Sequence, residues 1–171
     1  MSLAVTKSFV GLASFAQWIG ERQGWHRAVG ACGLGAISVL GMAPFNMWPL
    51  LFLTFPTFVW LLDGVAVEPN RRRRLRNAAI VGWSFGFGFF TAGLYWIANA
   101  FLVEADKFAW MIPFAMAALP AALALFYALA VFGAMAMWRG GARRIFALVA
   151  FLFAAEWLRG NIFTGFPWNL W

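Results

Sequence analysis

Residues 156 to 168 read EWLRGNIFTGFPW, and this stretch ends a hydrophobic helix with an acid, an arginine and a proline flanked by aromatic residues. Charged side chains lie next to hydrocarbon only where they are paired or serve a function. Glu156 and Arg159 are three residues apart, so they can meet on one face of a helix. Two interpretations follow: an intrahelical ion pair near a membrane interface, or a site in which Arg159 meets a lipid phosphate or Glu156 organises a loop.

The composition places the chain in lipid. Of 171 residues, 64% are hydrophobic and 11% are charged, and the mean hydropathy is +0.77. A soluble domain would carry about 25% charged and about 45–50% apolar residues. The net charge of +7 comes from short arginine clusters between apolar runs, which are typical of loops that face an anionic cytoplasmic leaflet. We therefore predict an all-α polytopic membrane helix bundle and no nucleic-acid partner, because the basic face that such binding needs is absent.

The single cysteine and single histidine limit the chemistry. Cys32 and His26 cannot form a disulfide framework, and they supply too few ligands for a Cys/His metal site, so no metal or cofactor is expected. Cys32 lies in an apolar run and is interpreted as a small packing residue, because a reactive thiolate needs a cationic or basic neighbour. No other pair of side chains makes a plausible catalytic constellation.

The hydropathy pattern predicts about five transmembrane helices. Residues 1–27 are a cytoplasmic or interfacial segment, residues 28–162 are the transmembrane domain, and residues 163–171 begin a periplasmic or interfacial segment. The predicted spans are 28–43, 47–62, 77–103, 108–138 and 145–162. The first two spans are about 16 residues or about 24 Å long, which requires a tight hairpin or a locally thinned bilayer.

The distribution of lysine and arginine sets the orientation. Eleven of these residues fall in residues 1–27 and in the polar loops 63–76 and 139–144, against Lys107 and Arg159 on the other side. This positive-inside bias predicts a cytoplasmic N-terminus and places residues 156–171 on the outer side, the periplasm of a bacterium. The arginine run from 71 to 76 is interpreted as a topology signal, with binding of anionic lipid as the alternative.

Aromatic residues near the outer side are candidates for lipid contact. Trp96 belongs either to the aromatic belt of the interface or to a lipid entry. Phe166 and Trp168 flank Pro167 and form either an interfacial anchor or a lip that guides acyl chains. The glycine-rich segment 82–88 has no following lysine and lies within an apolar span, so it indicates close helix packing and not a phosphate loop.

Three blocks of sequence resemble the bacterial apolipoprotein N-acyltransferase family, in the family's order and at its approximate spacing. They are APFNMWP at residues 43–49, GWSFGFG at 82–88 with Trp96 downstream, and EWLRG at 156–160 followed by TGFPW at 164–168. The resemblance covers nearly the whole chain from about His26 onward.

The resemblance implies a multi-span enzyme of the bacterial inner membrane with a periplasmic nitrilase-like hydrolase domain. Such enzymes transfer an acyl chain from a phospholipid to the N-terminal amine of a diacylglyceryl-cysteine lipoprotein through a thioacyl intermediate on a Glu-Lys-Cys triad. That triad belongs to a C-terminal domain that would follow Trp171, so neither Cys32 nor Glu156 inherits a catalytic role. We expect a membrane-domain fragment that is inactive alone, with a phospholipid acyl donor, a lipoprotein substrate and the missing hydrolase domain as partners. The candidate lipid-portal residues are Trp96, Glu156, Arg159, Phe166 and Trp168.

The alternative is a non-enzymatic membrane scaffold, or a small transporter or channel-like subunit. A transporter is expected to carry polar residues at mid-span or a pair of similar repeats, and neither is evident. The reading frame beyond Trp171 separates the alternatives, because a hydrolase domain with the triad identifies the enzyme.

Overall fold

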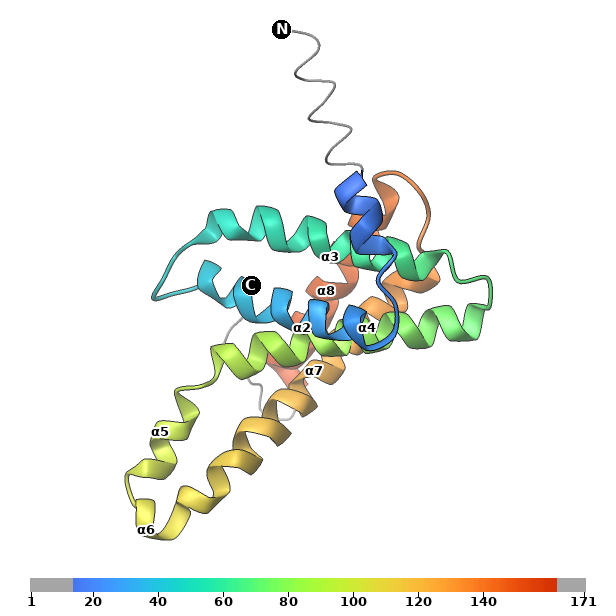
Figure 1. Cartoon of the computed structure of the whole chain (residues 1–171). Coiled ribbons are helices and arrows are strands. Elements are labelled where there is room, and N and C mark those ends of the chain that lie inside the picture. Colours follow the sequence, from blue (N-terminus) through green and yellow to red (C-terminus); the bar gives the residue numbers. More distant parts are fainter. Residues whose placement is uncertain (1–13, 163–171) are drawn as a thin grey trace, which may run out of the picture.

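A computed structural model describes residues 14–162, and the described part of the chain is helical without strands (Figure 1). Residues 14–20 form one helix. The elements that follow are α2 (Gly24–Ser38), η1 (Val39–Gly41), η2 (Trp48–Leu50), α3 (Leu51–Ala66), α4 (Arg71–Gly93), α5 (Ile97–Leu102), α6 (Ala105–Phe108), η3 (Ala109–Met111), α7 (Ile112–Ala136) and α8 (Arg143–Asn161). The all-α prediction is confirmed for these residues.

Helix α4 is the centre of the bundle and packs against α2 and α7. Small residues allow the close approach: a Cβ added at Gly88 would overlap the backbone carbonyl of Cys32, and one at Gly35 would overlap that of Phe85. Gly82 also lies close to α7, where an added Cβ would meet the carbonyl of Tyr127 and the side chain of Val131. Segment 82–88 therefore serves helix packing, as predicted.

The core between these helices is aromatic. Phe58, Phe85, Phe89 and Tyr127 are buried. The ring centroid of Phe85 lies 4.4 Å from that of Phe58 and 6.1 Å from that of Tyr127. These distances suit offset or edge contacts between rings, which add to the area that the rings bury.

The polar loop predicted for residues 63–76 is much shorter in the structure. Helix α3 continues to Ala66, and α4 already begins at Arg71. The side chain of Asn70 caps α4 by accepting a hydrogen bond from the backbone N–H of Arg73 at 3.1 Å. The arginines therefore occupy the first turns of a helix, although hydropathy alone predicts a loop there.

The region predicted as a continuous third span, residues 77–103, contains a break. Helix α4 ends at Gly93, and α5 starts after a turn at Ile97. Together with α6 and the first part of α7, α5 forms an arm that extends away from the rest of the bundle (Figure 1). Pro113 stands at the start of α7, and Pro120 lies inside that helix.

Two described helical stretches are long and apolar enough to cross a bilayer by length and composition: Trp48–Ala66 and Ala105–Ala136. Helix α2 is only 15 residues long, whereas α4 and α8 carry several charged residues. The arrangement with five transmembrane helices therefore stays a proposal.

Candidate functional site

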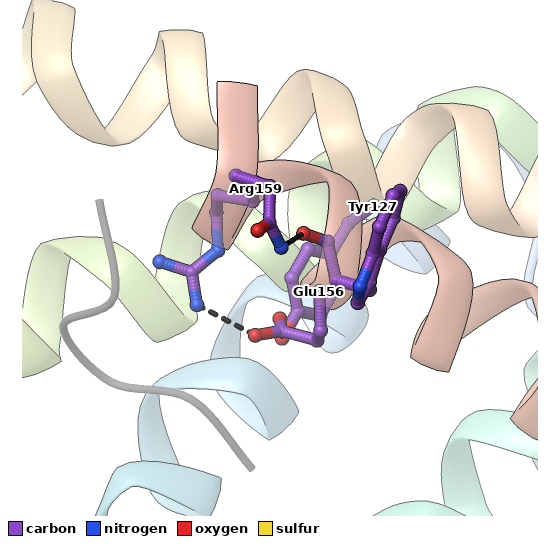
Figure 2. A network of polar contacts seen from close by, with 5 residues as sticks. Tyr127, Glu156 and Arg159 are labelled. Carbon is purple, nitrogen blue, oxygen red and sulfur yellow. Dashed lines mark hydrogen bonds and ion pairs between the residues drawn. The ribbon is translucent and has the colours of Figure 1, made fainter. Parts of the chain in front are cut away.

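A buried polar network joins α7 to the end of α8. The carboxylate of Glu156 accepts a hydrogen bond from the Tyr127 hydroxyl at 2.7 Å on one oxygen. Its other oxygen pairs with Nη2 of Arg159 at 2.6 Å. Figure 2 shows the guanidinium of Arg159 turned toward this carboxylate. The predicted ion pair between Glu156 and Arg159 is thus confirmed.

The ion pair lies inside the protein and not on its surface. The side chain of Arg159 is 1% exposed and that of Glu156 is 12% exposed. The guanidinium carbon also lies 5.0 Å from the ring centroid of Phe90 on α4, within the range of a cation–π contact. A second pair with the same spacing, Glu104 and Lys107, is 55% and 72% exposed. Burial therefore distinguishes the site from an ordinary surface pair.

Local helix geometry explains why these two residues meet. Positions three apart on a helix are neighbours on its surface. Arg159 also lies in the last turn of α8, where the negative end of the helix dipole favours a cation. Two contacts outside α8, to Tyr127 and to Phe90, then fix the pair between α7 and α4. The network can hold the end of α8 in one position. It thereby also sets the point, after Asn161, at which the chain leaves the helix.

Tyr127 is the member of the network that sequence reasoning missed. Helix α7 otherwise consists of apolar residues, glycine and proline, so its single hydroxyl was a usable signal. A buried tyrosine hydroxyl needs a hydrogen-bond partner. The pattern did not identify that partner, because Glu156 lies 29 residues further along the chain.

The other predicted portal residues are Trp96, Phe166 and Trp168. Trp96 lies between α4 and α5, six positions after Phe90, and is 40% exposed. Phe166 and Trp168 lie outside the described residues. Their lipid-portal role, like that of Glu156 and Arg159, stays a prediction.

A second polar cluster lies near the opposite end of α8. Asp63 of α3 accepts a hydrogen bond from Trp138 Nε1 at 3.1 Å and pairs with Nη2 of Arg144 at 3.3 Å. Through Asp63, the end of α3 is joined to the start of α8. Within residues 14–162, histidine, cysteine, aspartate and glutamate do not gather into a group of three that could hold a metal ion.

The described residues form an all-helical domain in which two helical stretches are long and apolar enough to cross a membrane, and a charged pair is buried at one end of the last described helix. Residues 34–171 match the family model for the apolipoprotein N-acyltransferase N-terminal domain. The chain belongs to the apolipoprotein N-acyltransferase family.

Several relatives bear the name apolipoprotein N-acyltransferase, and three of them illustrate the similarity. The protein of Rhodopseudomonas palustris is 56% identical over 146 residues, which cover 85% of this chain and 27% of the relative. That of Sinorhizobium medicae is 55% identical over 137 residues, covering 79% of this chain and 26% of the relative. That of Brucella suis is 53% identical over 150 residues, covering 86% of this chain and 28% of the relative. The chain thus spans about a quarter of the length of these relatives.

Proposed function

We propose that this chain is the N-terminal membrane domain of an enzyme that transfers an acyl chain from a phospholipid to the N-terminal amine of a diacylglyceryl-cysteine lipoprotein. The observation that carries the proposal is the family match over residues 34–171, together with more than 50% identity to proteins named for this activity. In this proposal the transfer runs through a thioacyl intermediate on a cysteine of a separate hydrolase domain. Forming a covalent intermediate divides one difficult step into two easier ones.

The residues of this chain serve as scaffold in the proposed reaction and not as nucleophile or base. The backbone of Cys32 packs against Gly88, and both carboxylate oxygens of Glu156 are engaged within the bundle. We therefore propose that residues 1–171 alone do not catalyse acyl transfer.

The proposed setting is the bacterial inner membrane, crossed about five times, with the N-terminus in the cytoplasm. The contact between Asp63 and Arg144 supports this orientation, because it brings the two basic segments 71–76 and 139–144 to the same end of the bundle. Arg159 is fifteen residues further along α8 than Arg144, or about 22 Å along the helix axis. The Glu156–Arg159 pair would then lie toward the periplasmic face.

At that face we propose that Glu156 and Arg159 are positioning residues. Their network fixes the end of α8, and the segment that follows carries Phe166 and Trp168. These two aromatic residues and Trp96 would line the path by which acyl chains pass from the outer leaflet toward the hydrolase domain.

An acyl-transfer assay tests this function. The full-length protein and residues 1–171 are each reconstituted in vesicles of phosphatidylethanolamine and given a synthetic diacylglyceryl-cysteine peptide. We expect the full-length protein to convert the peptide to its N-acylated form and residues 1–171 to leave it unchanged. Conversion by residues 1–171 would overturn the scaffold role, and a folded full-length protein without transfer would favour the non-enzymatic scaffold.

A further inference from the structure

An apolar groove separates α3 from α8. Helix α8 packs against α7, whereas α3 packs against α2 and α4, so the facing sides of α3 and α8 leave a cleft of about 630 Å³. This volume is within the range of about 300–1,000 Å³ found for clefts that bind small ligands. Phe52, Phe55 and Val59 line it from α3, and Leu148, Val149 and Leu152 line it from α8.

The groove is apolar along its length and basic at one end. Its charged lining residue is Arg144, in the first turn of α8. The guanidinium of Arg144 contacts Asp63 through Nη2, and its Nε has no hydrogen-bond partner among the described residues. Arg143 precedes Arg144 in the first turn of α8, and it lines a separate cleft together with Arg139; both side chains are exposed, and neither forms an ion pair within residues 14–162. This end therefore keeps a positive excess, which the positive N-terminal end of α8 reinforces.

We propose that the groove binds one anionic phospholipid of the cytoplasmic leaflet, with an acyl chain between α3 and α8 and the phosphate at Arg144. Charge complementarity selects this occupant: an apolar tail fits the lining, and a phosphate fits an arginine-rich end. A transmembrane helix from another part of the protein would fill the apolar cleft equally well, but it would match the basic end only if it carried an acidic side chain there. The proposal rests on the membrane orientation given under the proposed function.

This lipid differs from the acyl donor in its position. Arg144 and Arg159 lie at opposite ends of α8, so the two sites face opposite leaflets in the proposed orientation. A lipid in the groove would join α3 to α8 along a length where protein contacts are sparse. Its role is to stabilise the domain and not to supply an acyl chain.

Photo-crosslinking tests the proposal. The full-length protein is placed in nanodiscs of phosphatidylethanolamine that contain a trace of phosphatidylglycerol with a diazirine at the end of one acyl chain. After irradiation, mass spectrometry maps the labelled residues. We expect labels on the groove faces of α3 and α8, and Val149→Trp should reduce them to background by filling the groove. Ala150→Trp is the matched control, because Ala150 is exposed on the same helix and does not line the groove.

Competition with unlabelled lipids tests whether the site prefers an anionic headgroup. Arg144→Gln should lower the preference for phosphatidylglycerol over phosphatidylcholine roughly fivefold, which corresponds to about 1 kcal/mol for one basic side chain near an anionic headgroup. Arg143→Gln should change it less, because Arg143 does not line the groove. An unlabelled groove in the full-length protein would show that another protein segment covers it. Equal competition by both lipids would show ordinary annular lipid, and either outcome overturns the proposal.

Acyl transfer is measured on the same samples. Val149→Trp is expected to retain transfer, because the groove lies away from the Glu156 end of α8. Normal transfer with an unlabelled groove refutes the lipid site alone, whereas loss of transfer in the unmodified protein refutes the proposed function.

Discussion

Breaking the buried carboxylate network should destabilise the domain far more than breaking a surface ion pair of the same spacing. Glu156→Leu leaves the guanidinium of Arg159 buried at 1% exposure without its carboxylate partner. Removing one partner of a buried pair costs about 3–5 kcal/mol of unfolding free energy. Because Glu156 keeps 12% of its side chain exposed, we expect a value near the lower end, about 3 kcal/mol.

A double-mutant cycle isolates the contribution of Tyr127. Tyr127→Phe removes one hydrogen bond to a charged acceptor, which costs about 1.5–3 kcal/mol. In the Glu156→Leu background the same change should cost less by the contribution of this hydrogen bond, because that acceptor is already absent. The expected coupling free energy is therefore about 1.5–3 kcal/mol.

The assay is equilibrium unfolding in mixed micelles of dodecylmaltoside and sodium dodecyl sulfate, followed by tryptophan fluorescence. Glu104→Leu is the matched control: it breaks an i, i+3 pair of 2.8 Å that is more than half exposed, and such a pair contributes about 0–1 kcal/mol. Equal losses for Glu156→Leu and Glu104→Leu would refute the reasoning. So would single effects that add to within about 0.5 kcal/mol in the double variant.

Two further predictions concern helix packing. Gly88→Ala should destabilise the bundle by about 1–3 kcal/mol, because its Cβ would overlap the carbonyl of Cys32. Gly30→Ala is the control: its Cβ meets open space, so it should be neutral or stabilise by up to about 1 kcal/mol. Thermal denaturation in detergent compares the two variants, and equal melting temperatures would contradict the close contact at Gly88. Ser38→Ala should lower the free energy of unfolding by about 0.6–1.7 kcal/mol, because it removes the buried 2.8 Å hydrogen bond to Thr54. Adding Thr54→Val should restore part of this loss, because it removes the hydroxyl that Ser38→Ala leaves unpaired. A further loss in the double variant, measured in the same way, would show that the two hydroxyls do not act as a pair.

The sequence predicts the helical content and the small-residue contacts because both depend on local patterns. Gly82 and Gly86 are four apart on α4, and such spacing places them on one face of a helix whatever its partner is. The ion pair between Glu156 and Arg159 was predictable for the same reason. Its hydrogen bond to Tyr127 was not, because that contact depends on how α7 and α8 pack.

Helix ends were harder to predict than helix interiors. Hydropathy measures the preference for lipid and not the preference for helix, so the arginines after Asn70 read as a loop although they form the first turns of α4. The break after Gly93 has no proline or charge to mark it. Contacts between distant segments, such as Asp63 with Arg144, depend on tertiary packing and give no periodic signal.

The membrane orientation is the central claim, and cysteine accessibility tests it most directly. In a background of the full-length protein in which Cys32 and every other native cysteine, that of the hydrolase domain included, are replaced by alanine, Arg72→Cys and Asp106→Cys place a single thiol at exposed positions on α4 and α6. Intact bacterial spheroplasts are then treated with a membrane-impermeant maleimide. We predict that position 106 is labelled in intact cells and that position 72 is labelled only after lysis. Labelling of position 72 from outside, with position 106 protected, would contradict the account.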